Sequence, residues 1–414
     1  MGRVFKKLLK AAEAWRIVSS KGRLELEVEE VEVGRSLGRI LAADVISPID
    51  LPAFDKSAVD GYAVRSEDTT SASQHNPAIL KVVGEVRIGS SPSFGVGRGE
   101  AARIDTGAPL PRGSNSVVPL EYARELGGYV EIVKRVAPYE NVVRKGDDVR
   151  EGGIVLEEGR PLRPWDVALL KSLGVRRVEV YRMPKIALLS VGSELSDELA
   201  RGTTVDANRP NIAGMLASLG AEVADGGIVG DSLREVERAI AELVRRADAV
   251  VVSGGASVGA RDYTVRAVER LGELCFSGVA IRPGMPTSFG LVEGKPVFAL
   301  PGSPVAAYVA YKLFVETLIL YSAGARPVQY PAIARLESKI PSALGFLEFA
   351  RVKLRRVGGE LTAVLVRRRG SSILSSIAES DGVVAIPEDC EGLPEGSTVE
   401  VYLHDRPWGN LLGL

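Results

Sequence analysis

The hydrophobic and polar positions of residues 183–327 predict strands and helices in alternation. Apolar runs of strand length are each followed by apolar residues at helical spacing, such as Leu233, Val236 and Ile240. The expected strands are 185–192, 221–230, 249–252 and 295–300, and the expected helices are 209–220, 232–247, 262–272 and 301–320. The second of these helices starts with a capping-box pattern, Ser232 and Glu235. The alternation indicates a doubly wound α/β domain, 183–327, with a largely parallel sheet.

Two other regions contain short β-type runs separated by glycines. Residues 78–142 predict a small all-β domain, and we set its boundaries at 48–142 because Pro48 and Pro52 interrupt the chain. The last region, 328–414, also contains several strand-like runs and predicts a small barrel or sandwich.

The segments on either side of the small β domain form an expected fourth domain, 1–47 and 143–182, of elongated and mixed structure. Its expected elements are a helix at 5–19, strand-like runs in 24–45 around a short helix at 36–45, and a helix at 164–174 that begins at Pro164. The small β domain would then be an insertion between two halves of this domain. The first helix could instead pack on the α/β domain.

Composition excludes several classes of function. A net charge of −1 over 414 residues argues against a general nucleic-acid binder, so an anion site must be a local group of basic side chains. Two histidines and two widely separated cysteines argue against a histidine metal site, a Ser-His-Asp triad and a disulfide framework. No apolar run reaches the ~18 residues of a membrane span and no signal peptide is visible, so we expect a cytoplasmic protein. Many charges of both signs and 23 prolines are typical of a thermophile.

A glycine-rich loop follows the predicted inner strand 249–252. The strand ends in Ser253, Gly254 and Gly255, and Ser257 and Gly259 come shortly after. Ligands of open α/β sheets bind at the carboxyl ends of the strands, where glycines let backbone N–H groups approach a phosphate. A plain strand-to-helix turn is an equally good interpretation of this loop alone. The last predicted strand ends in a similar loop, Pro301, Gly302 and Ser303.

Acidic residues follow several of the same strands. Glu194, Asp231 and Asp262 would converge with the glycine-rich loop at one edge of the sheet. Mg²⁺ binds one or two carboxylates together with substrate phosphates, which makes Asp231 and Asp262 candidate metal ligands. Each acid also has a structural alternative, because Asp231 and Asp262 could merely cap the helices that follow them.

Three further segments carry candidate polar groups. Asp60 lies in a loop of the small β domain, where an Asx turn is the structural alternative, and Thr106 begins a tight turn of the same domain. Arg282 begins the segment RPGMP. Ser371 follows three consecutive arginines, 367–369, which suit an oxyanion site or an exposed basic strand end equally well.

Six motifs together resemble one known family. They are FDKSAVDGYAV at 54–64, DTGAPLPRGSNSVVPLE at 105–121, SVGSEL at 190–195, SGGASVGARDYT at 253–264, RPGMP at 282–286 and LPGSPVAAY at 300–308. In this order they resemble the molybdopterin molybdenumtransferases, the family of the MoeA proteins and of the E domain of gephyrin. The resemblance covers nearly the whole chain. The glycine-rich loop alone also resembles MogA-type adenylyltransferases.

The resemblance implies an L-shaped homodimer, with each active site between the α/β domain of one subunit and the inserted β domain of the other. The implied reaction converts adenylyl-molybdopterin and molybdate, or tungstate, to molybdenum cofactor and AMP with Mg²⁺. A MogA/MoaB-type adenylyltransferase would be a possible partner. Matching residues are Asp60, Thr106, Glu194, Asp231 and Asp262, and Arg351 and Ser371 match an arginine and a serine implicated in oxyanion binding.

The chain departs from the family pattern Lys-Pro-Gly-Lys-Pro at two positions. Arg282 keeps the first positive charge, whereas Met285 removes the second. This change implies a shifted oxyanion site, a preference for tungstate, or retained binding without transfer, unless Arg261 or the arginines 367–369 compensate. The alternatives to the transferase are a pterin-binding scaffold, as in gephyrin, and an adenylyltransferase, which the three additional domains disfavour.

Overall fold

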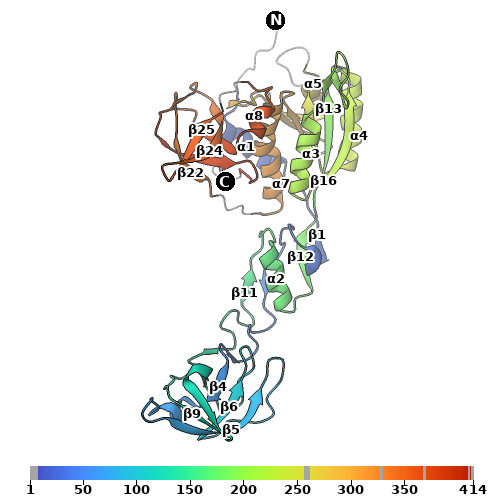
Figure 1. Ribbon diagram of the computed structural model, residues 1–414. Helices are drawn as coiled ribbons and strands as arrows, with labels where there is room; N and C mark the ends of the chain where they lie inside the picture. Colours follow the sequence, from blue (N-terminus) through green and yellow to red (C-terminus); the bar gives the residue numbers. More distant parts are fainter. Residues whose placement is uncertain (1–7, 256–261, 326–329, 367–369, 409–410, 412–414) are drawn as a thin grey trace.

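The computed structural model describes residues 8–255, 262–325, 330–366, 370–408 and 411. The chain is elongated (Figure 1). The α/β region and the C-terminal strands lie together at one end, a narrow region with β1, β12 and α2 forms the middle, and the small β domain forms the other end. The arrangement agrees with the predicted class of a multidomain α/β and β protein.

The α/β region contains a six-stranded sheet, and its four predicted strands are present. Their bounds are β13 Lys185–Val191, β16 Glu222–Val229, β17 Ala249–Gly254 and β21 Lys295–Leu300, and they run parallel in the order β16-β13-β17-β21. Two strands were not predicted, β20 (Ser288–Val292) and β18 (Gly272–Ser277). Strand β20 adds antiparallel to β21, and β18 adds antiparallel to β20 at the edge of the sheet. A two-residue turn with positive φ at Glu293 and Gly294 joins β20 to β21, which is the usual tight hairpin geometry.

Helices cover both faces of this sheet. They are α3 Asn208–Ser218, α4 Leu233–Arg246, α5 Tyr263–Leu271, and a helix from Pro304 to Ser322 made of α6 Pro304–Ala310, a π-helical turn Tyr311–Glu316 and α7 Thr317–Ser322. Ser232 precedes α4 as predicted, but its side chain makes no capping hydrogen bond, so the capping-box prediction was wrong. The helix Pro304–Ser322 is long and apolar enough to cross a membrane, contrary to our expectation, yet 94% of its most apolar stretch is buried, as in a core helix.

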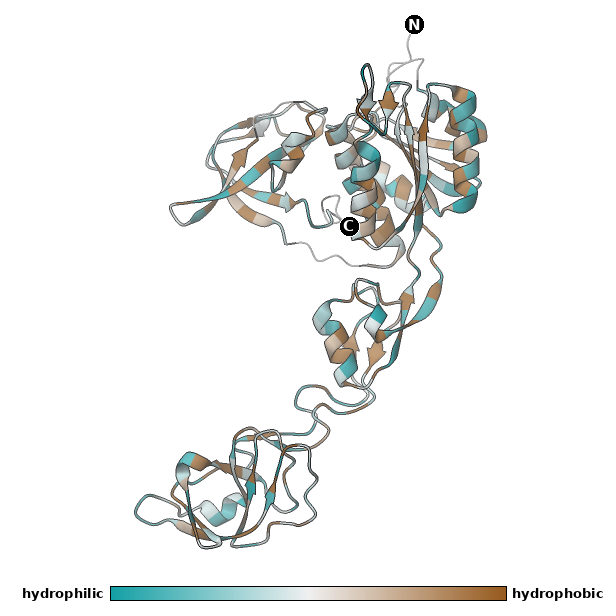
Figure 2. Cartoon of the chain, turned by 45° about the vertical axis from the view of Figure 1, so that its right-hand side comes forward, coloured by the Kyte–Doolittle hydropathy of each residue, from teal (hydrophilic) through white to brown (hydrophobic). Residues whose placement is uncertain are grey.

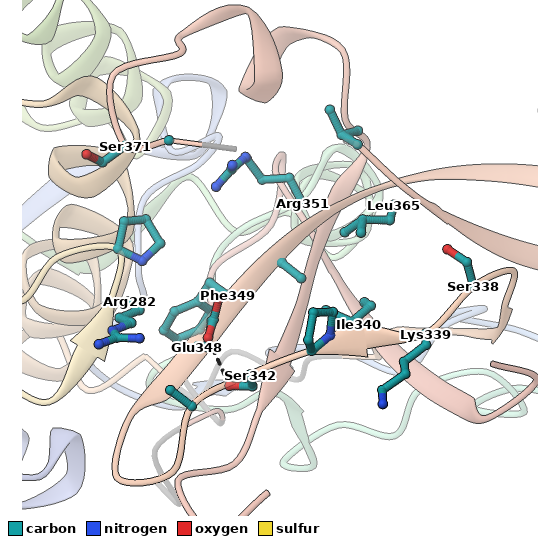
Figure 3. A pocket seen from close by; sticks show the side chains of 16 residues that line it. Arg282, Ser338, Lys339, Ile340, Ser342, Glu348, Phe349, Arg351, Leu365 and Ser371 are labelled. Atoms are coloured by element: carbon teal, nitrogen blue, oxygen red, sulfur yellow. Dashed lines mark hydrogen bonds between the residues drawn. The ribbon is translucent and has the colours of Figure 1, made fainter. Parts of the chain in front are cut away.

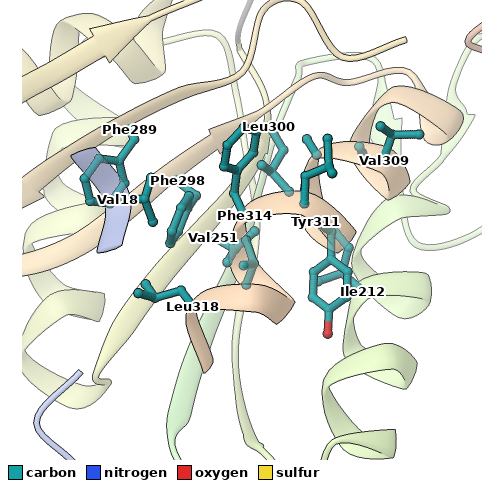
Figure 4. Packing of buried hydrophobic residues seen from close by; sticks show 14 of the residues in the cluster. Val18, Ile212, Val251, Phe289, Phe298, Leu300, Val309, Tyr311, Phe314 and Leu318 are labelled. Carbon is teal, nitrogen blue, oxygen red and sulfur yellow. The ribbon is translucent and has the colours of Figure 1, made fainter. Parts of the chain in front are cut away.

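The core of the α/β region has two halves because successive strand residues face opposite sides of the sheet. Ala187 and Leu189 pack against α4 and α5, whereas Ile186 and Leu188 pack with α3 and the helix 304–322. Figure 4 shows the second half, where Phe298 lies beside Val18 from the N-terminal helix, and Phe314 belongs to the same cluster. Apolar residues also mark the strands and the inner sides of the helices in Figure 2.

The N-terminal helix begins later than predicted. Helix α1 spans Ala11–Lys21, and its residues Ala14, Trp15 and Val18 are buried in the α/β core. Leu9 is in an extended bridge with Val279 instead of a helix. The helix therefore packs on the α/β region, which is the second of the two placements considered from the sequence.

The middle region joins the segments before and after the small β domain. Strand β1 (Val28–Glu32) pairs with β12 (Arg177–Tyr181), β2 (Val45–Ile46) pairs with β11 (Ile154–Leu156), and α2 (Pro164–Ser172) packs nearby. The predicted short helix at 36–45 is absent. Ile40 and Leu41 instead form bridges with Pro161 and Val180, because the buried Leu41 is packed by strands rather than by its own helix.

The small β domain is a six-stranded sheet in the order β7-β4-β6-β5-β9-β8. The bounds are β4 Gly61–Val64, β5 Ala78–Val86, β6 Glu100–Ile104, β7 Ser116–Pro119, β8 Ala123–Leu126 and β9 Tyr129–Ile132. The short strands β3 (Lys56–Ser57) and β10 (Val142–Val143) pair beside it. Separate clusters of buried side chains include Tyr62 and Val64 on one side and Ala63 on the other.

The C-terminal region is a closed five-stranded barrel. Its strands are β22 Ala332–Leu336, β24 Leu347–Val357, β25 Glu360–Leu365, β26 Gly382–Ile386 and β28 Thr398–Leu403, and the pairing of β24 with β26 closes the ring. Strand β19 (Ile281–Arg282) pairs with β24 and brings the segment RPGMP to the barrel. The small elements are β14 Leu195–Ser196, β15 Thr204–Val205, β23 Ile340–Pro341, β27 Gly392–Leu393, α8 Ser375–Ala378 and the 3₁₀ turns Val33–Arg35, Ser66–Thr69 and Leu120–Tyr122.

Candidate active site

The carboxyl ends of three parallel strands lie side by side at one edge of the α/β sheet. Val191 of β13 is in register with Gly254 of β17, and Ser253 is in register with Leu300 of β21. Asn208 at the start of α3 joins the two loops, because its amide nitrogen donates to Ser253 Oγ at 2.7 Å and to the Gly302 carbonyl at 2.8 Å. The sequence placed Asn208 before a helix but gave no sign of this bridge.

The glycines at this edge are required by close packing. Gly254 has φ +85°, and a Cβ atom there would lie 2.3 Å from the Val191 carbonyl oxygen. Gly255 has φ +63° and faces Thr264. Backbone groups of Gly255 and of the loop Pro301, Gly302 and Ser303 can therefore approach a ligand closely. The predicted residues Ser257 and Gly259 lie outside the described residues.

Two of the predicted acids follow adjacent strands. Asp231 and Ser193 hold each other by reciprocal bonds, since Asp231 N donates to Ser193 Oγ at 2.9 Å and Ser193 N donates to Asp231 Oδ2 at 3.3 Å. Glu194 is the next residue after Ser193, and both Glu194 and Asp231 are exposed. The strand ends β13 and β16 thus present two carboxylates to solvent.

Asp262 caps a helix, which is the structural alternative that we considered from the sequence. Its carboxyl group also has a raised pKa. Asp262 is the N-cap of α5, and its Oδ1 accepts a hydrogen bond from Val265 N at 3.0 Å. Burial, together with the nearby negative charge of Glu269, raises its pKa from 3.8 to about 6, although the hydrogen bond from Val265 opposes the shift. A desolvated carboxylate of this kind is stabilised by a cation beside it.

The donor chemistry of Asp231 and Asp262 fits a magnesium ion that also binds substrate phosphate. Asp262 uses one oxygen for the helix cap, and no hydrogen bond to its second oxygen is found among the described residues. No group of three or more His, Cys, Asp or Glu side chains suited to a metal is found in the described part of the chain. Mg²⁺ needs only one or two carboxylates when phosphate oxygens and water complete its shell.

Asp60 and Thr106 form a second polar pair in the small β domain. Asp60 Oδ1 accepts hydrogen bonds from the Thr106 backbone nitrogen at 2.7 Å and from its hydroxyl at 2.9 Å. These bonds hold the pKa of Asp60 below its ordinary value, so the carboxylate stays ionised. The pair lies beside β4 and β6, in the domain at the opposite end of the elongated molecule from the α/β sheet (Figure 1). Within one chain, it therefore cannot act on a ligand at the sheet edge.

A cavity of about 960 Å³ brings together three of the predicted residues at the junction of the barrel and the RPGMP segment. Arg282, Arg351 and Ser371 all line it, although 89 residues separate Arg282 from Ser371 along the chain. Figure 3 shows the guanidinium of Arg351, from β24, directed toward the segment that carries Ser371. Burial lowers the pKa of Arg351, but an arginine remains charged at every physiological pH. The cavity is suited to an anion.

Arg282 is held by an aromatic ring. Its guanidinium carbon lies 4.0 Å from the centre of the Phe346 ring, which is a cation–π contact that favours arginine over lysine. Met285 does not line the cavity, and its carbonyl accepts a hydrogen bond from Val279 N at 2.9 Å. Arg261 and the arginines 367–369, which could replace the positive charge missing at Met285, lie outside the described residues.

Two charged residues of the cavity were missed by sequence reasoning. Lys339, next to β23, is exposed and has no salt bridge within the described ranges. Glu348 accepts a hydrogen bond from Ser342 at 2.9 Å. Neither residue belongs to a recognisable motif, because only the closure of the barrel brings them to the cavity.

Family models match three successive parts of the chain. Residues 9–174 match the MoeA N-terminal region (domain I and II), 187–320 match a "Probable molybdopterin binding domain", and 333–404 match the MoeA C-terminal region (domain IV). The three matches follow one another in the order expected for the whole family.

Relatives and solved structures match over nearly the full length. A curated relative from Methanocaldococcus jannaschii is 36% identical over 97% of this chain and 99% of its own. A molybdopterin molybdenumtransferase from Haemophilus influenzae is 34% identical over 94% and 95%. Two crystal structures of MoeA molybdopterin biosynthesis proteins from Pyrococcus horikoshii match with TM-scores of 0.81 and 0.86, at 38% and 32% identity. Each match covers 96% of this chain and 99% or 100% of the other chain. The chain therefore belongs to the MoeA family.

Proposed function

We propose that this enzyme of molybdenum cofactor biosynthesis inserts molybdate or tungstate into adenylyl-molybdopterin and releases AMP. The observation that carries the proposal is the cavity in which Arg282, Arg351 and Ser371 meet. Two guanidinium groups and a hydroxyl offer several donors to a tetrahedral dianion, and guanidinium groups remain charged across physiological pH. The chain's membership of the family supports the same reaction.

The sheet edge would bind the nucleotide part of the substrate. Backbone groups of Gly254, Gly255 and Gly302 can approach phosphates, and Asp231 and Asp262 would hold Mg²⁺ against them. An ion held by Asp231 and Asp262 would supply neutralisation of the phosphate charge at this edge. Positioning and charge neutralisation provide most of the rate in phosphoryl chemistry.

The positions of Asp60 and Thr106 support a homodimer with shared sites. The pair is preorganised by two hydrogen bonds but lies far from the sheet edge of its own chain (Figure 1). In a twofold dimer, the small β domain of one subunit can reach the sheet edge of the other. A MogA/MoaB-type adenylyltransferase would supply the substrate in the cytoplasm, where the two free thiols Cys275 and Cys390 stay reduced.

The test of this function is AMP release by the purified protein. Adenylyl-molybdopterin and Mg²⁺ are supplied first, and molybdate or tungstate is then added while AMP is quantified by chromatography. We expect AMP release that depends on an oxyanion and on Mg²⁺. Tight binding of the pterin nucleotide without AMP release from either oxyanion would support the scaffold alternative and exclude the transferase.

Restoring the missing family cation should strengthen oxyanion binding. The substitution Met285→Lys adds a positive charge within the segment RPGMP, three residues after Arg282, and we expect the KM for molybdate to fall about three- to tenfold. Met285→Leu is the matched control, because it changes the side chain without adding charge. An unchanged KM in Met285→Lys would show that the position no longer contributes to oxyanion binding.

Lys339 should contribute part of the positive charge that the chain lacks at Met285. Replacing Lys339 by alanine should raise the KM for the oxyanion about three- to tenfold at low ionic strength, with a smaller effect at high salt. Lys353→Ala is the control, since Lys353 is an exposed lysine of the same barrel outside the cavity lining. Equal effects of the two substitutions would rule out a specific role for Lys339.

A further inference from the structure

The segment that carries Ser371 is tied to the first turn of helix α6. Val305 N donates a hydrogen bond to the Ser371 carbonyl at 2.9 Å. Val305 follows the loop Pro301, Gly302 and Ser303, so this bond joins the barrel segment to the nucleotide edge of the α/β sheet. The position of the Ser371 hydroxyl in the cavity therefore depends on how this segment lies against α6.

The other end of the same segment is held by a histidine. After Ser371 the chain forms the short helix α8 and reaches Ser380, whose hydroxyl lies 2.8 Å from His404 Nε2. His404 Nδ1 lies 2.6 Å from the hydroxyl of Tyr308, one turn beyond Val305 on α6. Ser380, His404 and Tyr308 thus form a hydrogen-bonded chain that returns to the same helix.

This chain of hydrogen bonds is neutral, with Tyr308 and Ser380 buried and His404 half-buried. The Ser380 hydroxyl donates to the Ser376 carbonyl at 2.8 Å, which favours the tautomer with the proton on Nε2 and a hydrogen bond from Tyr308 to Nδ1. Burial lowers the pKa of His404 to about 4. The histidine is therefore uncharged at neutral pH, and both of its ring nitrogens are occupied by hydrogen bonds within the protein.

A buried ion pair fixes the segment that carries His404. Lys312 Nζ lies 2.7 Å from Glu316 Oε2 in the π-helical turn, and it also donates to the Arg406 carbonyl at 2.7 Å. Trp408 stacks on Phe349 of the barrel, with ring centres 5.6 Å apart, and contacts Tyr308 edge-on. The helix 304–322 therefore holds the C-terminal end of the barrel independently of Ser371.

We propose that Tyr308, His404 and Ser380 are positioning residues that set the place of Ser371 in the oxyanion cavity. The proposal rests on the proposed transferase function. The segment 371–380 is held at its start by Val305 and at its end by His404. Val305 is part of α6, and His404 is hydrogen-bonded to Tyr308 of the same helix. Loss of the end anchor would let α8 shift and would move the Ser371 hydroxyl relative to Arg351.

The test uses Tyr308→Phe in the full-length protein, because this substitution removes only one hydroxyl. We expect the oxyanion KM to rise about fivefold or more, while the Kd of adenylyl-molybdopterin stays unchanged. Ser380→Ala should act in the same direction. In a Ser371→Ala background, Tyr308→Phe should have no further effect on KM, because the hydroxyl that it positions is already absent.

Hydrogen exchange followed by mass spectrometry gives a readout that does not depend on activity. Peptides covering 370–380 should exchange faster in Tyr308→Phe than in the wild type. The control is Tyr402→Phe, since the Tyr402 hydroxyl donates to Glu400 on the barrel and not to α6. This control should keep both the KM and the exchange rate of the wild type.

The outcomes separate the two proposals. Wild-type KM and wild-type exchange in Tyr308→Phe would overturn the positioning role, whatever the activity of the parent protein. Equal KM effects of Tyr308→Phe with and without Ser371 would also overturn it. A wild-type protein that releases no AMP would overturn the transferase function, and the exchange measurement would still decide whether the hydrogen-bonded chain holds the segment.

Discussion

Replacing Asp262 by asparagine should make the protein more stable at neutral pH and much less active as a transferase. Asparagine keeps the side-chain oxygen that caps α5, so the helix should persist. It removes a carboxylate whose pKa is raised to about 6 by burial. Loss of the proposed Mg²⁺ ligand should lower AMP release on the order of 100-fold.

The stability gain should depend on pH in a defined direction. Between the ordinary pKa of 3.8 and about 6, the folded protein binds more protons at Asp262 than the unfolded chain does, so the free energy of unfolding of the wild type falls as pH rises. The asparagine variant does not titrate. Its advantage should therefore grow from pH 4 to pH 6 and stay constant above, at about 1 to 3 kcal/mol.

Unfolding midpoints measured from pH 4 to pH 8 would test this prediction. Asp225→Asn is the control, and its expected change in stability has the opposite sign. The reason is that the Gly227 backbone and Arg209 hold the pKa of Asp225 below its ordinary value. That variant should be less stable than the wild type at neutral pH. An Asp262→Asn protein with the wild-type pH profile would show that the carboxylate is not desolvated.

Two inactive variants should restore activity when they share a dimer. Asp60→Asn and Asp262→Asn each damage every site of their own homodimer. A mixed dimer has one site that combines the intact β domain of one subunit with the intact α/β domain of the other. Random mixing gives about half heterodimers, and each heterodimer has one intact site of its two. About a quarter of wild-type activity should therefore return after co-refolding.

The control for complementation is the double variant Asp60→Asn/Asp262→Asn mixed with the wild type. Its heterodimers contain no complete site, so only wild-type homodimers should be active. Light scattering on the same samples would report the mass of the assembly. No recovered activity from the two single variants, in samples that are dimeric, would place each complete site within one chain and contradict the shared arrangement.

The local hydrophobic pattern was sufficient to predict most strands and helices of the α/β region. It was insufficient where tertiary packing determines the secondary structure. The strands 185–192 and 295–300 were recognisable because buried parallel strands have continuous apolar runs. The antiparallel strands β18 and β20 were missed, since GELCFS has charged and apolar residues without a clear period. The short helix expected at 36–45 was wrong because Leu41 is buried by strands of the middle region.

The sequence by itself determined the family, the order of the regions and the identity of most candidate residues, because these depend on motifs and on local hydrophobic periodicity. Only the tertiary structure decided which of those residues meet. It brought Arg282, Arg351 and Ser371 to one cavity, added Lys339, and placed Asp60 and Thr106 far from the sheet edge. The physical reason is that such contacts depend on the closure of the barrel and the packing of α6, which join residues many positions apart.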